Sequence, residues 1–433
     1  VLTLGMAVDA NVLIYERTKE ELRAGKTVKQ ALTDGYKNAF SAIFDSNFTS
    51  IITGIILFYF GTGPIRGFAT TLIIGIICSF FTAVFLTRIV YEHYLGKGKL
   101  QNLTFTTGIS KNLMQNTKIK FMEISKKSSI VFGIFAVVCL AFMLTRGLSK
   151  SIDFTGGRNF VIQFEQPVEP EEVRNILEGV ITEDNVSAIA LGTDHKTIRV
   201  STNYRIEEDS ENIDAEIEEF LFTSLKAAGK LSADLDLATF IDRDNRAGGS
   251  IISSQKVGPS IAEDITKGAI ISVILALVAI FLYILLRFRN VAYSVGAIVA
   301  LGLDTLFIMG LYSICWGWMP FSLEIDQTFI GAILTAIGYS INDKVVVFDR
   351  IREYTHLYPK RDKKQLFNDA INTTLARTIN TSLSTLIVLL AIFFLGGDSI
   401  RSFAFAMILG VVFGTCSSIF IAAPTAYSII RKK

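Results

Sequence analysis

Two aspartates lie inside apolar stretches of the sequence, where an ionised side chain is costly. Asp9 precedes Glu16 by seven residues, and Asp343 precedes Asp349 by six. At the rise of an α-helix, each aspartate is therefore about 9 to 10 Å below the charged end of its helix. A carboxylate at such depth needs pairing, hydration or protonation, and acids that face a bundle interior commonly serve proton or ion movement. The alternative is a structural hydrogen bond between helices.

A third candidate is Arg377, which begins an apolar stretch whose first turns are unusually polar. A guanidinium keeps its proton at any relevant pH, so it can hold a nearby acid ionised and let that acid protonate when it withdraws. We expect Asp343 to be its partner; the alternative is that Arg377 extends to the cytoplasmic surface and has no part in gating. Asp304 is a further buried acid, for which we expect a hydrogen bond between helices. The polar positions that we expect to support this site are Asn11, Asp45, Asn342, Lys344 and Asn380.

The stretches that carry these residues are long enough to cross a bilayer. Of the 433 residues, 50% are hydrophobic, and the mean hydropathy is +0.45, so lipid must be part of the solvent. A crossing takes about 17 to 25 mostly apolar residues. Candidate spans are residues 67–87, 128–145, 266–286, 291–316, 327–348, 379–395 and 403–430. Less regular candidates are residues 39–60, and residues 1–15, which we interpret as the remnant of a truncated span.

The charges are divided along the chain as membrane topology would divide them. Residues 151–265 contain 23 acidic and 10 basic residues, so the rest of the chain has an excess of bases. Lys and Arg collect in cytoplasmic loops, and the basic segments therefore set the orientation. With alternating crossings, the chain starts outside, places residues 151–265 outside and ends with its C-terminus in the cytoplasm.

The acidic segment is expected to form one small domain, called the outer domain below. Asp153 to Gly157 predicts a turn, because the paired Gly156 and Gly157 reach backbone angles that other residues avoid. The pattern that follows is typical of a ferredoxin-like α+β sandwich. We expect strands at 159–165, 186–191, 197–202 and near 239 and 251, and helices over 170–180 and 211–228. Its acidic surface could bind unfolded chains, or it could be a solvated face without partners.

An internal repeat organises the spans. Gly5 to Arg17 matches Gly338 to Arg350 at an offset of 333, and Ile65 to Ala69 matches Ile400 to Ala404 at an offset of 335. Both copies begin outside, so the repeats are parallel and related by an axis along the membrane normal. Sites in such proteins lie near the bilayer midplane between the repeats.

Several of these motifs, in this order, resemble the SecDF translocation factors of the RND superfamily. Gly5 to Arg17 is similar to the fourth-span motif of SecD, whereas Asp153 to Gly157, Gly338 to Arg350 and Leu375 to Ser382 are similar to SecF motifs. The resemblance implies a polytopic α-helical membrane protein, an RND-type bundle with a parallel pseudo-repeat and one ferredoxin-like periplasmic domain. The implied parts are residues 1–92 (SecD-like spans), 93–127 (basic cytoplasmic linker), 128–148 (first SecF-like span), 149–262 (periplasmic domain) and 263–433 (five further SecF-like spans).

The resemblance also implies a function in the bacterial cytoplasmic (inner) membrane. SecDF proteins use the proton-motive force to promote translocation and release of preproteins. The family's functional acids fall on Asp9 and Asp343, and its functional arginine falls on Arg377. Lys344 replaces the expected Thr, so either Lys344 or Arg377 could be the main partner of Asp343. The implied partners are the SecYEG translocon, unfolded preproteins, membrane lipids and, indirectly, SecA, with YidC and YajC as further candidates and no nucleic acid.

Two other functions compete with this one. An RND exporter of small molecules or lipids would use similar acids, but would normally carry two large outer domains. A scaffold or holdase would gain nothing from acids inside the membrane. The sequence has no nucleotide-binding signature, catalytic triad or metal cluster, so we expect a transporter that is not an enzyme and needs no cofactor beyond an ion gradient. Sodium is an alternative to the proton, because carboxylates with nearby Asn and Ser oxygens suit either ion.

Overall fold

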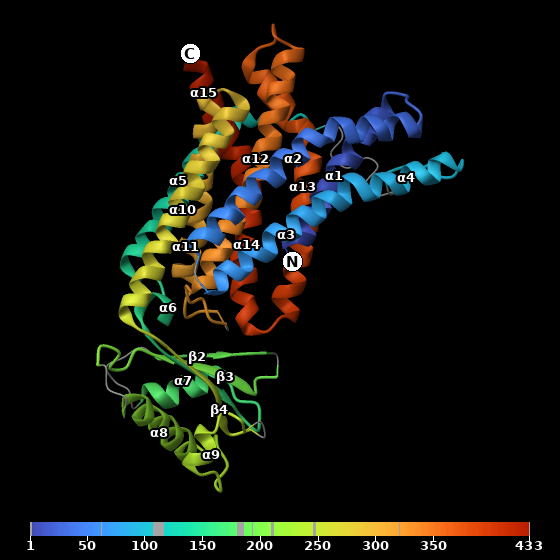
Figure 1. Ribbon diagram of the computed structural model, residues 1–433. Coiled ribbons are helices and arrows are strands. Elements are labelled where there is room, and N and C mark those ends of the chain that lie inside the picture. Colours follow the sequence, from blue (N-terminus) through green and yellow to red (C-terminus); the bar gives the residue numbers. More distant parts are fainter. Residues whose placement is uncertain are drawn as a thin grey trace.

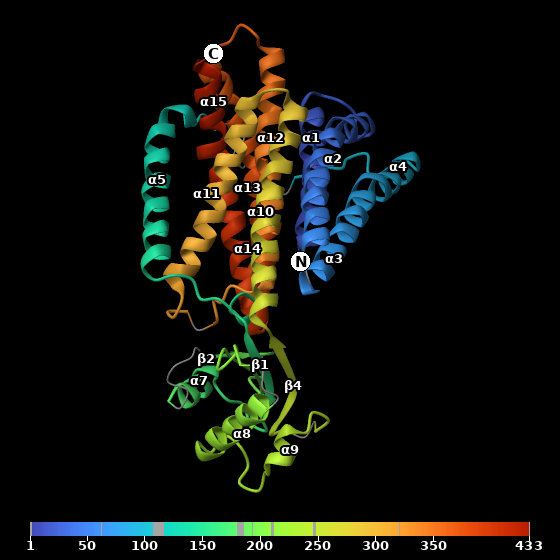
Figure 2. The ribbon, with the colours of Figure 1, turned by 60° about the vertical axis from the view of Figure 1, so that its left-hand side comes forward.

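The computed structural model describes residues 2–61, 63–106, 117–179, 186–192, 194–208, 212–245, 248–319 and 321–432. Within these residues, eight helical segments are long and apolar enough to cross a membrane. They form one bundle with the outer domain at one end (Figures 1 and 2). The segments are α2 (Val28–Phe60), α3 to α4 (Gly63–Phe81, Thr87–Gly96), α5 (Phe121–Thr145), α10 (Pro259–Phe288), α11 (Val291–Cys315), α12 (Gln327–Leu357), α13 (Lys363–Leu395) and α14 to α15 (Asp398–Ser417, Ala423–Lys432). Helix α1 (Leu2–Arg23) precedes them.

Helix α12 is at the centre of the bundle and α5 is at its edge (Figure 2). The most apolar window of α12 is 94% buried, whereas that of α5 is 11% buried. From Ile130 to Leu144, the exposed side chains of α5 are hydrocarbon, with Leu144 85% exposed. Such a surface is typical of a helix that faces lipid. The polytopic fold class predicted from the sequence is confirmed.

Helices α12 and α14 approach each other closely through small residues. A Cβ atom on Gly410 would lie 2.4 Å from the Cβ of Ala336, and one on Gly414 would lie 2.8 Å from the Cβ of Ser340. Close backbone approach through glycines is a common way to pack helices in lipid, where burial of apolar area drives little association. These contacts hold the two helices at a fixed distance.

The final span of each repeat contains a π-helical turn at a matching position. The turn η1 (Thr82–Leu86) lies between α3 and α4, and η2 (Ser418–Ala422) lies between α14 and α15. The first residues of the two turns are 336 positions apart, which is one more than the repeat offset of 335. The two repeats therefore share this local irregularity of the backbone as well as their sequence motifs. Turns of π-helix are frequent near functional sites.

The outer domain has the topology of a ferredoxin-like sandwich. Its sheet has the order β2-β3-β1-β4, and all three strand pairs are antiparallel. The strands are β1 (Gly157–Gln163), β2 (Val186–Ala190), β3 (Thr197–Thr202) and β4 (Ser250–Val257), and α7 (Pro170–Glu178) and α8 (Asn212–Ala227) supply apolar residues to its core. The predicted helix ends at 180 and 211, and part of the basic linker (107–116), lie outside the described residues.

One predicted strand of this domain is wrong. The segment near residue 239 forms a short helix, α9 (Leu237–Ile241). Asp236 starts it by accepting a hydrogen bond from the Thr239 N–H at 2.9 Å, and Phe240 is directed into the core. An aspartate side chain that satisfies a free N–H group is a helix start signal, and it outweighs the β preference of the short apolar run. The strand expected near 251 is confirmed as β4.

The predicted turn at Asp153 to Gly157 is a one-turn helix, α6 (Ile152–Thr155), followed by the two glycines. Gly156 and Gly157 have φ angles of 77° and 154°. A Cβ atom on Gly157 would lie 2.7 Å from the carbonyl oxygen of Thr202 and 2.5 Å from a methyl carbon of Ile152. Only glycine fits this close approach of α6 to strand β3.

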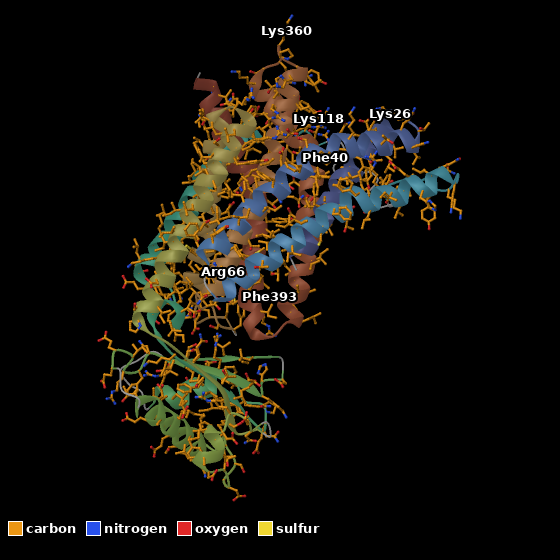
Figure 3. All side chains as sticks on the ribbon, in the orientation of Figure 1. Lys26, Phe40, Arg66, Lys118, Lys360 and Phe393 are labelled. Carbon is orange, nitrogen blue, oxygen red and sulfur yellow. The ribbon has the colours of Figure 1, made fainter. Side chains whose placement is uncertain are left out.

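Basic side chains gather at the end of the bundle opposite to the outer domain, called the inner end below. Lys26, Lys118 and Lys360 lie toward the inner end, whereas Arg66 and Phe393 lie toward the outer domain (Figure 3). This distribution agrees with the alternation of crossings inferred from the charge pattern.

Candidate ion-relay site between the two repeats

Helices of the first repeat pack against helices of the second repeat at the candidate residues. Helix α1 packs against α13, and α12 packs against α2. Asp9 on α1, Asp343 on α12 and Arg377 on α13 are 4%, 5% and 8% exposed. The three residues that the sequence singled out are therefore all buried at the interface between the repeats.

Arg377 contacts Asp9. Its Nη2 lies 3.4 Å from Asp9 Oδ1. The expectation that Asp343 is the partner of Arg377 is wrong for this conformation, and the arginine is buried rather than extended to the surface. Among the described residues, its Nε and Nη1 atoms have no hydrogen-bond partner. A guanidinium offers five N–H groups, so Arg377 has donors left for a second carboxylate.

Asp343 is held by hydroxyl groups rather than by a cation. Thr415 of α14 donates a hydrogen bond to Asp343 Oδ2 at 3.2 Å, and Thr415 in turn lies 2.6 Å from the hydroxyl of Ser382 on α13. Asp9 and Arg377 both lie close enough to act on Asp343 electrostatically. Arg377 thus binds Asp9, whereas Asp343 accepts a hydrogen bond from a hydroxyl group.

Lys344 does not compete for Asp343, because it is paired with Asp304. Its Nζ lies 2.9 Å from Asp304 Oδ2, and the two side chains are 0% and 3% exposed. Ser340 and Ser417 also donate to this carboxylate oxygen, at 2.7 and 2.9 Å. The hydrogen bond between helices expected for Asp304 is confirmed, and it is reinforced by an ion pair. Removing one partner of such a pair typically costs about 3 to 5 kcal/mol.

The other predicted supporting residues are distributed over the bundle. Asp45 is bound by Arg287 at 2.6 Å and by the hydroxyl of Tyr283 at 2.9 Å, so it joins α2 to α10. Asn11 donates to the carbonyl of Ala7 on its own helix. Asn342 is buried on α12, and Asn380 is partly buried on α13. Asp45 therefore has a structural contact of its own.

The sequence reasoning missed the hydroxyl groups around the acids. Tyr339 on α12 lies 3.0 Å from the hydroxyl of Thr385 and donates to the carbonyl of Thr381 at 3.4 Å. Thr415, which donates to Asp343, was also missed. Threonines spaced by three or four residues within the apolar segment after Arg377 were the available signal, because that spacing places them on one helix face.

A small cavity with charged residues in its lining reaches the site from the inner end. It has a volume of about 50 Å³, and its lining includes Arg377 together with Glu16, Glu20 and Asp349. A water molecule needs about 10 to 15 Å³ of such space. The cavity therefore provides room for a few waters between Arg377 and the charged helix ends.

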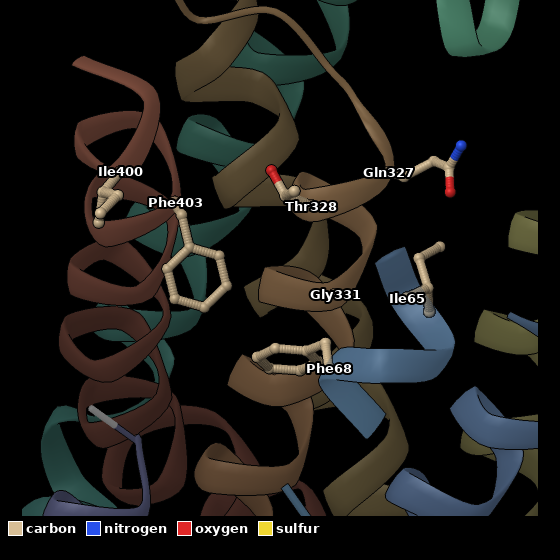
Figure 4. Close-up of a pocket in the computed structure, with 7 residues that line it drawn as sticks. All are labelled: Ile65, Phe68, Gln327, Thr328, Gly331, Ile400 and Phe403. Atoms are coloured by element: carbon tan, nitrogen blue, oxygen red, sulfur yellow. The ribbon is translucent and has the colours of Figure 1, made fainter. Parts of the chain in front are cut away.

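A second cavity lies where α3, α12 and α14 begin, at the end of the bundle near the outer domain, and Figure 4 shows the side chains that line it. Its volume is about 270 Å³. Ile65 and Phe68 line it from α3, and Ile400 and Phe403, their counterparts at the repeat offset of 335, line it from α14. The remaining lining residues are Gln327, Thr328 and Gly331 of α12. This mainly apolar cavity is lined by equivalent residues of both repeats.

The start of α12 is joined to the outer domain. Backbone hydrogen bonds connect Ser151 to Ile325 at 3.0 Å, and the Gln327 N–H donates to Asp153 Oδ2 at 3.3 Å. Burial raises the pKa of the Glu324 carboxyl, and Ser187 and Arg199 of the outer domain partly oppose that shift. The helix that carries Asp343 therefore begins in direct contact with the Asp153 to Gly157 motif.

Parallel repeats of spans, with buried acids and an arginine between them, define the chain as an RND-type membrane protein. The family model described as "Protein export membrane protein SecD/SecF, C-terminal" matches residues 241–432. The SecD/SecF GG motif matches residues 141–168, and the MMPL family matches residues 1–90. The protein translocase subunit SecF of Rhodothermus marinus is 39% identical over 318 residues, which cover 73% of this chain and 95% of that protein. The chain belongs to the SecD/SecF family.

Fused relatives align with nearly all of the chain. The protein translocase subunit SecDF of Thermus thermophilus is 33% identical over 425 residues, which cover 96% of this chain and 52% of that protein. A crystal structure of SecDF from Thermus thermophilus matches with a TM-score of 0.79 and covers 100% of this chain and 54% of its own. The chain thus spans about half the length of these SecDF relatives.

Proposed function

We propose that the chain is the membrane motor part of an auxiliary subunit of the Sec translocon, driven by the proton-motive force. In this proposal it promotes translocation and release of preproteins on the outer side of the bacterial inner membrane, with its C-terminus in the cytoplasm. The observation that carries the proposal is the unequal pairing of two buried acids, because Arg377 binds Asp9 whereas Asp343 accepts a hydrogen bond from Thr415.

The proposed cycle uses the unequal pairing of the two acids. While Asp343 holds a proton, it needs no cation, and Arg377 stays with Asp9. When the proton leaves through the inner cavity, the ionised Asp343 attracts the free donors of Arg377. Because α13 carries Arg377, this exchange moves α13 relative to α1 and α12. A carboxylate that loses its proton in a low-dielectric site gains strongly from a nearby cation.

The movement would reach the outer domain through α12. Its first turn donates to Asp153, and Ile325 pairs with the chain that leads into β1. The outer domain is the proposed contact surface for unfolded preproteins. The proposed partners in the membrane are SecYEG and lipids, with SecA acting indirectly and YidC and YajC as further candidates. The proposed energy source is an ion gradient, with the proton as the favoured ion and sodium as the alternative.

Asp343→Asn tests this function, since it keeps the shape of the side chain but cannot ionise. The full natural polypeptide is placed in inverted membrane vesicles with the translocon, and ion uptake and preprotein release are measured together. We expect both to fall at least tenfold in a protein that remains folded and inserted. Asp234→Asn, at an exposed position of the outer domain, is the matched control. Preprotein release by Asp343→Asn that still depends on the pH gradient would refute the proposal. Ion uptake that depends on the sodium gradient rather than on the pH gradient would identify sodium, instead of the proton, as the coupling ion.

A further inference from the structure

The buried pair of Lys344 and Asp304 has no part in the proposed relay, yet it lies next to it in the sequence. Lys344 directly follows Asp343. Its Nζ contacts Asp304 Oδ2 at 2.9 Å and Ser417 Oγ at 3.0 Å, and it also donates to the hydroxyl of Ser340. The pair joins α12 to α11 and α14, three helices of the same repeat.

The two neighbouring charges of α12 point in different directions. Consecutive side chains leave an α-helix about 100° apart. Asp343 reaches Thr415 and lies within electrostatic range of Asp9 and Arg377, whereas Lys344 reaches Asp304 on α11. Any rotation of α12 that turned Asp343 away from the relay would also withdraw Lys344 from Asp304.

Such a withdrawal is strongly opposed, because both charges are almost completely buried. A buried ion without its partner loses both hydration and pairing. The serines that complete the site reinforce this: Ser340 and Ser417 both donate to the same oxygen of Asp304. Packing alone would not require charges here, since apolar residues of similar volume fill such positions at least as well. What the ion pair adds is a directional constraint.

We propose that Lys344 and Asp304 are positioning residues of the relay. Their ion pair fixes the rotation of α12 about its own axis and thereby keeps Asp343 directed toward Asp9 and Arg377. The effect of this pair on ion transport rests on the proposed function. The rotation of α12 itself can be measured without any transport assay.

The rotation is measured by a disulfide between α12 and α2. Ser50 Oγ donates to the carbonyl of Gly338 at 3.3 Å, and a Cβ atom on Gly338 would lie 3.9 Å from Ser50 Cα. The Cα atoms of the two residues are therefore closer than the roughly 7 Å beyond which a disulfide cannot form. Ser50→Cys with Gly338→Cys, in a background without the four native cysteines, therefore reports whether α12 keeps its rotational setting.

The decisive variant replaces both charges, Lys344→Met with Asp304→Leu. Either single replacement leaves a buried charge without its partner and is expected to reduce the folded protein in the membrane, so the double variant carries the test. We expect its 50–338 disulfide yield to fall at least fivefold, while Tyr312→Phe, which removes a buried hydrogen bond between α11 and α14, leaves the yield unchanged. An unchanged yield in the double variant overturns the inference.

Ion uptake gives the second readout. In the double variant we expect the initial rate to fall at least tenfold and the pH at half-maximal uptake to move, because α12 no longer presents Asp343 in one orientation. A wild-type rate and pH profile would show that the pair is only structural. If the double variant behaves as wild type while Asp343→Asn is inactive, this inference alone fails. If Asp343→Asn is itself fully active, the proposed function fails, and the disulfide yield still decides the positioning role.

Discussion

Arg17 of the first repeat binds Glu353 of the second, with Nη2 and Oε2 3.3 Å apart. The reciprocal contact is also made, because Arg350 Nη2 lies 3.0 Å from Glu20 Oε1. Both arginines and both glutamates are separated by 333 residues. Each arginine also binds the glutamate of its own helix. This four-residue network joins α1 to α12 at the inner end, beside the cavity that reaches Arg377.

Removing the two glutamates should open this end of the bundle. A partly exposed ion pair contributes about 0.2 to 1 kcal/mol. Glu20→Gln with Glu353→Gln removes two contacts between the repeats and should therefore shift the population of open conformations roughly 2- to 30-fold. The measurement is the rate at which a membrane-impermeant thiol reagent modifies Ala42→Cys, a residue that lines the cavity. Asp369→Asn, which breaks an ion pair with Arg361 outside this network, is the control. Equal modification rates in all proteins would contradict the role of the network.

Arg377→Lys should fail although it preserves the charge. A lysine has no planar fork and cannot reach toward two carboxylates in fixed directions. We expect ion uptake to fall at least tenfold while the amount of inserted protein stays normal. The matched control is Arg352→Lys, whose arginine binds Asp349 at a partly exposed position. Full activity of Arg377→Lys would show that only the positive charge at this position matters and that the planar guanidinium group does not.

Gly157→Ala should destabilise the outer domain. The new methyl group would meet the Thr202 carbonyl at a backbone angle that side chains rarely adopt, and strain of this kind costs about 1 to 3 kcal/mol. The effect is measured as the thermal unfolding of this domain within the whole protein, with hydrogen exchange of the β1 and β3 amides as the probe. Gly179→Ala, with an ordinary helical φ of −65°, should change little. Similar stability of the two variants would count against the predicted clash.

The contact between α12 and the outer domain should weaken as pH rises. Burial raises the pKa of Glu324, so the intact contact binds its proton more tightly than the opened one. Its stabilising effect is complete below the ordinary glutamate pKa of about 4.3 and is lost as pH rises through the raised pKa. Glu324→Gln cannot ionise, so its Ile325 amide should exchange hydrogen more slowly than that of wild type at pH 8 and equally at pH 4. Glu171→Gln, at an exposed position, is the control, and identical exchange in Glu324→Gln and wild type at both pH values would exclude this pH dependence.

The sequence predicted the architecture well because each level of the fold leaves a periodic or repeated signal. Apolar length predicted the spans, charge sign predicted which segment forms the outer domain, and the offset of 333 predicted the parallel repeat. The prediction of a strand near residue 239 was wrong because a mostly apolar run of five residues is too short to show a helical or strand period. The sequence reasoning also overlooked Asp236, the aspartate that starts the helix.

The pairing of charges was harder to predict than their burial. Burial of Asp9, Asp343 and Arg377 follows from their depth along each helix. Which acid meets Arg377 depends on how the helices are rotated, and rotation is set by distant contacts such as the one between Lys344 and Asp304. A single sequence shows residues along a chain, but it does not show the angle at which one helix faces the next.

The two cavities differ in the chemistry of their linings, because charged residues line the one beside Arg377 and mainly apolar residues line the other. Water enters polar spaces more readily than mainly hydrocarbon ones. In the proposed cycle, the small cavity beside Arg377 is therefore the path by which protons leave, whereas the larger cavity between Phe68 and Phe403 is the barrier on the other side. A hydrophobic constriction can close a pathway by excluding water. Wetting the larger cavity, by parting the repeats at that end, would be sufficient to reverse the side from which the acids are supplied.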